Sequence, residues 1–143
     1  MLRRRRGFTL LELLIALVIV GVLLMSALPS YREHLLRTRR ALARAELQKI
    51  VVRQEQFFIE RRAYAASLTD LGYPASPYAI DANGNPRLPS QGNGIYLIQL
   101  ATAARSYTLY ATPALADPRC GGLSLDSLGT RAASGTSGVA YCW

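Results

Sequence analysis

The first part of the chain is dominated by a long apolar run. Residues 13–28, LLIALVIVGVLLMSAL, contain no charged side chain. Counted from Phe8 to Leu28 the segment holds 21 residues, and a helix rising about 1.5 Å per residue would span roughly 31 Å, about one hydrocarbon thickness of a bilayer. The pattern therefore predicts a helix over residues 8–29 that crosses a membrane or fills an equally apolar core.

The apolar positions become periodic after this run. Residues 31–62 contain neither glycine nor proline, and apolar side chains recur at spacings of three, four and seven, which is typical of an amphipathic helix. The recurring positions are Leu36, Ala43, Leu47, Ile50, Phe57 and Tyr64. We therefore expect residues 30–62 to continue the helix and to bury one stripe against a sheet. Gly21 and Pro29 interrupt the first half, and they predict a kink or local melting there.

Residues 63–93 are rich in proline and glycine and contain the turn pair Asn83-Gly84. This composition predicts a long loop with local turns, including one short helical turn at residues 69–73. Such a loop is either a packed connection or a surface presented to neighbouring subunits or ligands. The sequence leaves both interpretations open.

Alternating apolar and polar positions follow in residues 94–143. Residues 95–100 and 107–112 are rich in β-branched and aromatic side chains and predict a hairpin with its turn at residues 103–106. A third strand is expected at residues 122–126 and a fourth at residues 130–133. The predicted fold class is α+β, with one long helix whose second half packs on a small antiparallel β-meander.

Charge predicts the direction of the apolar segment in a membrane. Four consecutive arginines, Arg3 to Arg6, precede it, and such residues stay on the cytoplasmic side. The N-terminus is therefore expected in the cytoplasm, with everything after Leu28 exported. A cleaved secretory signal peptide is the alternative. The apolar run is longer than such signals need, and Met25-Ser26-Ala27 has a methionine where a cleavage site requires a small residue.

Glu12 places a carboxylate at the edge of the apolar run, where it is costly in a bilayer unless another group pairs with it. It closes the string Gly7-Phe8-Thr9-Leu10-Leu11-Glu12, which follows the basic leader and precedes the apolar run and Pro29. This string resembles the processing signal of type IV pilins and the related pseudopilins. The resemblance implies that a prepilin peptidase removes residues 1–7 by cutting between Gly7 and Phe8, and that Phe8 becomes the N-methylated first residue.

The resemblance also gives Glu12 a role in assembly. Cleavage would leave an ammonium group on Phe8, and a neighbouring chain shifted along a shared axis could place its Phe8 ammonium against Glu12. Removing one partner of such a buried pair costs about 3 to 5 kcal/mol. In the family the pair recruits and registers subunits, and the stretch from Gly21 to Pro29 extends when subunits pack into the filament.

Several later segments resemble PilE-type minor pilins. These segments are Arg53–Phe58, Leu71–Pro74, Leu123–Arg131 and the pair Cys142-Trp143. The resemblance implies the type IV pilin fold. Because major pilins often carry longer C-terminal regions, the short region here favours a minor subunit.

The formal net charge of +8 belongs partly to the leader. Without Arg3 to Arg6, thirteen basic residues remain against nine acidic ones, which leaves +4. The excess lies on the helix between Arg32 and Arg62. We interpret it as a solvated flank near anionic lipid headgroups and acidic neighbours in preference to a DNA contact, since a basic stripe alone is an unspecific signal for nucleic acid.

Cys120 and Cys142 form an even pair downstream of a membrane anchor, which is typical of a disulfide in an oxidising compartment. A loop of this length predicts a stabilisation of about 3 kcal/mol. Metal or redox chemistry is disfavoured, because the spacing is not that of CxxC and His34 is the single histidine. Residues 81–85, DANGN, are weakly similar to a calcium loop, but no acidic ligand follows, so we expect a turn.

We find no catalytic motif and expect neither enzymatic activity nor a cofactor or metal. The sequence predicts a subunit of a type IV pilus, most similar to a minor pilin that primes or caps the filament. It would lie in the bacterial inner membrane with a periplasmic exported domain and later in the extracellular pilus. Expected partners are other pilins and minor pilins, the prepilin peptidase and the pilus assembly machinery. The alternatives are a type II secretion pseudopilin, a DNA-uptake receptor pilin, which would bind nucleic acid, and a membrane-anchored enzyme.

Overall fold

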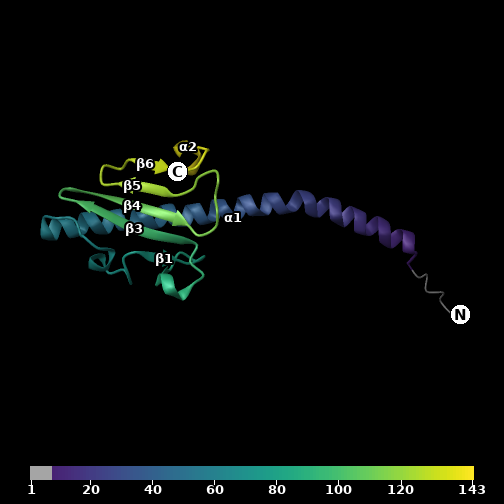
Figure 1. The fold of residues 1–143 in the computed structure, drawn as a ribbon, viewed down its shortest axis with the longest axis horizontal. Coiled ribbons are helices and arrows are strands. Elements are labelled where there is room, and N and C mark those ends of the chain that lie inside the picture. The colour runs from purple at the N-terminus through teal and green to yellow at the C-terminus, as the bar shows by residue number, and fades with distance from the viewer. Residues whose placement is uncertain (1–7) are drawn as a thin grey trace. The chain divides into compact units, whose positions relative to one another are not determined.

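The computed structural model describes residues 8–143 and begins with one long helix. Helix α1 runs from Leu10 to Arg61 and includes both Gly21 and Pro29 without a break (Figure 1). The chain divides into two compact units between Leu36 and Arg37, and each unit is described by itself. We call residues 37–143 the head.

The first unit is the apolar part of α1. Its large apolar side chains are exposed, from Leu10 at 77% to Leu28 at 60%. By length and composition, α1 is the one helix among the described residues that could cross a membrane. Among residues 8–143 nothing packs over these apolar side chains, so they require an apolar environment outside this part of the chain.

The head contains a six-stranded antiparallel sheet in the order β2-β1-β3-β4-β5-β6. The strands are β1 (Tyr78–Ile80), β2 (Pro86–Arg87), β3 (Tyr96–Ala103), β4 (Ser106–Pro113), β5 (Leu123–Asp126) and β6 (Arg131–Ala133). Two short 3-10 helices, η1 (Leu68–Leu71) and η2 (Pro89–Gln91), precede the long strands, and helix α2 (Val139–Cys142) follows them. The chain therefore has the predicted α+β fold class.

The four strands predicted in residues 94–143 are confirmed as β3 to β6. The β3–β4 hairpin pairs Tyr96 with Pro113 at one end and Ala103 with Ser106 at the other. Both strands are longer than predicted, because pairing across the hairpin continues through residues whose side chains alternate less clearly. The predicted helical turn is present as η1, which begins after Ser67 in a reciprocal capping arrangement with Asp70.

The prediction that residues 63–93 form only loop and turns is wrong. Within this region Tyr78, Ala79 and Ile80 form strand β1, which is buried throughout and pairs with β3. Strand β2 then pairs with β1 at Ala79 and Ile80. A strand of three residues between proline-rich stretches is too short to show alternation, and it becomes a strand because β3 offers it an open edge.

The core lies between the sheet and the head part of α1 (Figure 1). Helix residues Ala43, Leu47 and Ile50 are fully buried there, as the periodic pattern predicts. Gln54 is also fully buried. Its side chain donates to the backbone oxygen of Ala65 at 3.2 Å and accepts from the Ala65 backbone nitrogen at 2.8 Å. This amide holds the first turn of the loop against the helix.

The end of α1 is set by its backbone conformation. Arg62 has a φ of 58°, a left-handed conformation that cannot continue a right-handed helix. Its backbone nitrogen still donates to the oxygen of Phe58 at 2.8 Å. The predicted helix boundary at residue 62 is therefore confirmed to within one residue.

Candidate functional site

The first candidate site is the start of α1. Thr9 precedes the helix, and its hydroxyl accepts a hydrogen bond from the backbone nitrogen of Glu12 at 3.3 Å, while its backbone oxygen accepts from that of Leu13 at 3.2 Å. Thr9 thus acts as an N-cap. Glu12 lies in the first helical turn, where a carboxylate complements the positive end of the helix dipole.

Phe8 and Glu12 are both exposed, with Phe8 at 81%. Gly7, which forms the other half of the predicted cleavage site, lies outside the described residues. The pairing of Glu12 with a Phe8 ammonium involves a second chain, and it stays a prediction. The kink or melting expected at Gly21 and Pro29 also stays a prediction, with both residues helical in the single chain.

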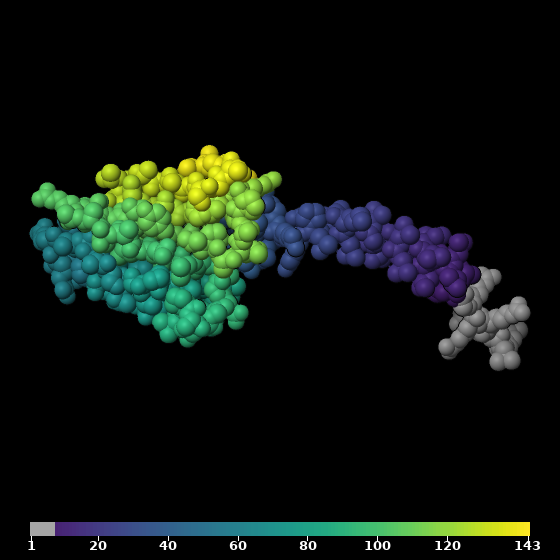
Figure 2. All heavy atoms as spheres, viewed as in Figure 1, coloured from purple at the N-terminus to yellow at the C-terminus, as the bar shows by residue number. Residues whose placement is uncertain are grey.

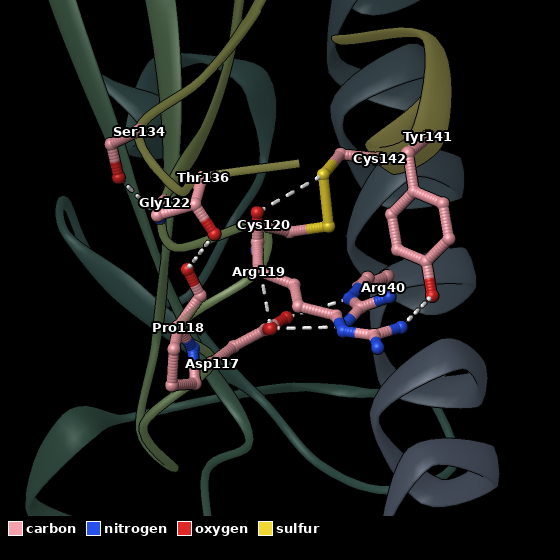
Figure 3. Close-up of polar contacts among 10 residues, drawn as sticks. All are labelled: Arg40, Asp117, Pro118, Arg119, Cys120, Gly122, Ser134, Thr136, Tyr141 and Cys142. Carbon is pink, nitrogen blue, oxygen red and sulfur yellow. Dashed lines mark hydrogen bonds and ion pairs between the residues drawn. A yellow bond between two sulfur atoms is a disulfide. The ribbon is translucent and has the colours of Figure 1, made fainter. Parts of the chain in front are cut away.

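The second candidate site is the region where the C-terminal residues meet α1 and the connection between β4 and β5. The disulfide predicted between Cys120 and Cys142 is present, and the two Cα atoms lie 5.5 Å apart (Figure 3). It joins the β4–β5 connection to helix α2. Figure 2 shows the last residues, in yellow, along one side of the head next to the strand residues that precede them.

A buried ion pair lies beside the disulfide. Arg40 donates from Nε to Oδ2 of Asp117 at 2.6 Å and from Nη2 to Oδ1 at 2.9 Å. The two side chains are only 3% and 1% exposed. Burial alone would raise the pKa of Asp117, but hydrogen bonds from Arg40 and from the backbone nitrogen of Cys120 outweigh it and hold the pKa below its usual range.

Backbone hydrogen bonds join the segment around the disulfide to the residues after β6. The Gly135 backbone nitrogen donates to the oxygen of Cys120 at 2.9 Å, and that of Thr136 donates to the oxygen of Pro118 at 3.2 Å. The Thr136 hydroxyl also donates to the Pro118 oxygen, at 3.3 Å (Figure 3). The backbones of Gly135 and Arg119 lie so close together that a Cβ atom at position 135 would clash with the Arg119 carbonyl group. A glycine is therefore required at this position.

Helix α2 adds further contacts to this region. Arg44 of α1 donates to the backbone oxygen of Trp143 at 2.6 Å. The Trp143 indole nitrogen donates to the oxygen of Ala132 in edge strand β6 at 2.8 Å. The C-terminal residues thus connect α1 to the edge of the sheet.

An arginine-lined hollow of about 340 Å³ opens next to this region. Arg37, Arg40 and Arg44 line it along one face of α1, together with Tyr141 and Cys142. We call it the proximal hollow. Its lining, among the residues that the structure describes, contains no acidic side chain.

A second hollow, of about 460 Å³, lies at the C-terminal end of α1. Its lining includes Arg62 and Arg105 and the rings of Phe58 and Tyr64, whose centroids are 4.8 Å apart. We call it the distal hollow. Tyr64 in turn makes an edge contact with Tyr107, also at 4.8 Å, so the aromatic floor of this hollow is fixed to the sheet.

The segment that is weakly similar to a calcium loop is a capped turn. Oδ1 of Asp81 accepts hydrogen bonds from the backbone nitrogens of Asn83 at 2.8 Å and Asn85 at 3.0 Å. These two hydrogen bonds hold the pKa of Asp81 below its usual 3.8. Within residues 8–143 no group of three or more histidine, cysteine or acidic side chains lies close enough to hold a metal ion.

The pair of Arg40 and Asp117 could not be found from the sequence. Arg40 lies in the basic stretch between Arg32 and Arg62, which we interpreted as a solvated flank, and Asp117 was assigned no role. The two residues are separated by 77 positions, and neither lies in a motif. The one available signal was indirect, since Arg40 falls three residues before Ala43 on the face of the helix that the apolar stripe marks as buried.

The comparisons with known families assign this architecture. The family described as "Type IV minor pilin ComP, DNA uptake sequence receptor" matches residues 29–124. The prokaryotic N-terminal methylation motif matches residues 2–28. The chain is a type IV pilin. It belongs to the family of that minor pilin, and the pilin resemblance seen in the sequence is confirmed.

Several known pilins are similar to this one. The type IV major pilin PilA of Myxococcus xanthus is 33% identical over 70 residues, which are 49% of this chain and 32% of that protein. A fimbrial protein of Pseudomonas aeruginosa is 28% identical over 112 residues, 73% of this chain and 72% of the relative. This pilin therefore spans about a third of the Myxococcus relative and most of the Pseudomonas one.

A solved structure of a type IV pilin from Shewanella oneidensis is also similar to this pilin. It covers 73% of this chain and 93% of its own, with 24% identity and a TM-score of 0.46. The family supports assembly with other pilin subunits and the pilus machinery, and together with the apolar helix it indicates a membrane-anchored pilus subunit. Proteins of this family are generally structural.

Proposed function

We propose that this pilin is a minor subunit that primes or caps assembly of a type IV pilus and does no chemistry itself. The observation that carries the proposal is the position of Glu12, in the first turn of an apolar helix whose first part lies within the methylation motif. In this proposal the apolar segment stores the subunit in the inner membrane, with a cytoplasmic N-terminus and a periplasmic head. The assembly machinery then extracts it into the filament.

The proposal includes processing at Gly7. A prepilin peptidase would cut between Gly7 and Phe8, and Phe8 would be N-methylated. The support is the string from Gly7 to Glu12 and the match of the methylation motif to residues 2–28. Intact mass spectrometry of the protein from sheared filaments should show a chain that lacks residues 1–7 and carries one added methyl group. A retained leader or a cut near Ala27 would contradict this proposal.

The same proposal gives Glu12 the role of setting the axial register between neighbouring subunits. The Phe8 ammonium of one subunit would pair with Glu12 of the next within an apolar bundle, where each charge is costly without the other. Glu12→Leu should leave the head folded and the helix in the membrane, yet reduce incorporation into filaments by more than tenfold, given about 3 to 5 kcal/mol for one lost partner. Glu12→Asp is the matched control, because it keeps the charge.

The measurement is the ratio of this pilin in sheared filaments to that in membranes, by immunoblot. Equal incorporation of wild type and Glu12→Leu would show that Glu12 does not register subunits. The cell fraction in which the protein is found also tests the alternative that this chain is a secretion pseudopilin. A pseudopilin would be found in the periplasm and membranes and be absent from surface pili.

A second candidate function is binding of DNA by the head. The matched family is described as a DNA uptake sequence receptor, which is the specific observation in favour. The distal hollow also combines two arginines with two aromatic rings. Arginine side chains bind phosphates, and aromatic rings stack on bases.

Binding of a duplex and of a single-stranded oligonucleotide to the full mature chain in detergent would test this function. Binding should weaken steeply with added salt. Replacing Arg62 and Arg105 by glutamine should weaken DNA binding at any given salt concentration and make that binding less dependent on salt. The control is the charge-matched double variant Arg37→Gln/Arg119→Gln. No binding at low salt would remove DNA reception as a function of this chain.

A further inference from the structure

The head contains two asparagine–glycine pairs, Asn83-Gly84 and Asn93-Gly94. The first lies between β1 and β2, and the second lies between η2 and β3. Both asparagines are exposed and both glycines are half-buried. Before a glycine, the side-chain amide of asparagine is open to attack by the next backbone nitrogen, because glycine has no Cβ atom to obstruct the approach. The hydrogen bonds around each pair therefore decide which of the two can react.

The pair at Asn83 is held by hydrogen bonds to Asp81. The Gly84 backbone nitrogen, which would have to act as the nucleophile, donates to the backbone oxygen of Asp81 at 2.9 Å. The backbone nitrogens of Asn83 and Asn85 donate to Oδ1 of the same aspartate at 2.8 and 3.0 Å. Reaction at this pair first requires the turn to open.

The pair at Asn93 is not held in this way. Over residues 8–143, the structure places no hydrogen-bond acceptor on the Gly94 backbone nitrogen and no hydrogen-bond partner on the Asn93 side chain. Gly92 and Asn93 have φ values of 68° and 57°, so the segment follows neither a right-handed helix nor a strand. The Gly94 nitrogen can therefore react without the loss of a hydrogen bond.

We propose that Asn93 is a site of spontaneous deamidation and that the turn capped by Asp81 protects Asn83 from the same reaction. The Gly94 nitrogen attacks Cγ of Asn93, and a nitrogen–carbon bond forms. The bond from Cγ to Nδ2 breaks, and ammonia leaves with the proton of the Gly94 amide. Water then adds to one of the two carbonyl carbons of the succinimide ring and opens it. The products are aspartate and isoaspartate, and the reaction consumes only water.

Deamidation would change the head at the start of strand β3. Either product replaces a neutral amide by a carboxylate, which is ionised at neutral pH, so the net charge of the chain falls. Isoaspartate also lengthens the backbone by one carbon atom just before Ile95, whose nitrogen donates to the oxygen of Ile80 in β1 at 2.7 Å. Because the chain holds no group that reverses the reaction, the modified fraction should rise with the age of the subunit.

Peptide mapping by mass spectrometry follows both pairs in one sample. Arg87 lies between them, so trypsin places Asn83 and Asn93 in separate peptides, and fragmentation assigns the modified residue in each. The full mature chain in neutral detergent is held at mildly alkaline pH, where the attacking amide loses its proton more readily, and is sampled over time. We expect Asn93 to deamidate at least about fivefold faster than Asn83, because one backbone hydrogen bond must break before Asn83 can react.

The chain unfolded in urea with its disulfide reduced is the first control. Both pairs have the same dipeptide sequence, so their rates should become similar once the turn at Asp81 is lost. A difference that is present in the folded chain and absent in urea must then come from the fold.

Two variants test the two sites separately. Asp81→Ala removes the carboxylate that holds the turn, so it should accelerate deamidation of Asn83 several-fold and leave Asn93 unchanged. Asn93→Gln keeps an amide, but attack would need a larger ring, so the second peptide should stay unmodified at this position while Asn83 reacts as before. Gly94→Ala is unsuitable, because its Cβ atom would lie 2.8 Å from that of Ala79.

Equal rates at the two pairs in the folded chain, or a faster rate at Asn83, would overturn the proposal. A rate at Asn93 far below its rate in urea would overturn it too, because it would mean that the fold holds this segment as firmly as the turn at Asp81. The measurement needs no filament. Its outcome is therefore independent of Glu12 registration, which is read from filaments.

Discussion

At the scale of single residues, the buried pair of Arg40 and Asp117 joins parts of the head that are 77 positions apart in the sequence. Both side chains are almost completely buried, and the pair joins α1 to the connection that carries Cys120. A buried charge without its partner is far more costly than the pair is favourable. The consequence of losing one member should therefore exceed that of losing any surface charge.

Asp117→Asn tests this contact. The amide keeps the shape of the carboxylate but removes the negative charge that Arg40 contacts at two atoms, so the free energy of unfolding should fall by about 3 to 5 kcal/mol. Urea unfolding of the full chain in detergent, followed by Trp143 fluorescence, measures the loss. Glu60→Gln, an exposed residue on the same helix as Arg40, is the control and should change stability by less than about 0.5 kcal/mol.

A loss below about 1 kcal/mol for Asp117→Asn would show that water reaches the pair and compensates Arg40. Removing both charges as Arg40→Met/Asp117→Leu should recover part of the stability, because the apolar pair needs no partner. A double variant with a lower free energy of unfolding than Asp117→Asn would contradict that account.

At the scale of elements, two turns of the sheet have the same construction. Asp81 caps the turn between β1 and β2. Asp126 caps the turn between β5 and β6, with Oδ1 accepting from the backbone nitrogens of Leu128 at 2.9 Å and Thr130 at 2.8 Å. In each turn the glycine one residue before the last position has a positive φ, 79° at Gly84 and 82° at Gly129.

These turns predict a loss of stability in acid. Backbone hydrogen bonds hold the pKa values of the Asp81 and Asp126 carboxyl groups below the usual 3.8. The largest contribution comes from the backbone of Asn85 at Asp81 and from the backbone of Thr130 at Asp126. A depressed folded-state pKa contributes stability above the unfolded-state value, and that stability is lost as the pH falls through the folded-state value. Unfolding measured from about pH 5 to 2 should therefore show falling stability.

The variants Asp81→Asn and Asp126→Asn isolate the two turns. Each should flatten the dependence of stability on pH below about 4, because the amide does not titrate. Asp117 also has a lowered pKa, so part of the dependence should persist in the double variant. An unchanged slope in that double variant would mean that the turns do not contribute.

How far the elements could be predicted depended on whether their signal was local. Residues 95–100 are rich in β-branched and aromatic side chains and were correctly assigned to a strand, and the strand predicted at residues 130–133 is present as β6. Strand β1 was missed, because three apolar residues form a strand only when β3 supplies the partner.

The candidate sites divide in the same way. Cys120 and Cys142 could be paired from residue type and compartment alone. The proximal hollow could not be predicted from the sequence, because Tyr141 and Arg119 come close to Arg40 only after the sheet, the disulfide and α2 have formed. Contacts between residues far apart in sequence have no local signature.

At the scale of the whole molecule, the two units have different sources of order. Residues 10–36 form a helix whose apolar surface is exposed, so a membrane or a filament must supply its environment. The head has its own core and one covalent link, between Cys120 and Cys142. Loss of that link should affect the head while leaving membrane insertion intact.

The double variant Cys120→Ser/Cys142→Ser tests this separation. Opening a loop whose ends are 22 residues apart should cost the head about 3 kcal/mol of stability. The C-terminal residues would then be held by noncovalent contacts such as that of Arg44 with Trp143, so protease should cleave them faster. Because the apolar run is unchanged, the amount of protein in the membrane pellet should equal that of wild type before protease is added. Loss of the variant from the pellet at that stage would show that a folded head is needed for insertion, and that the two units are not independent.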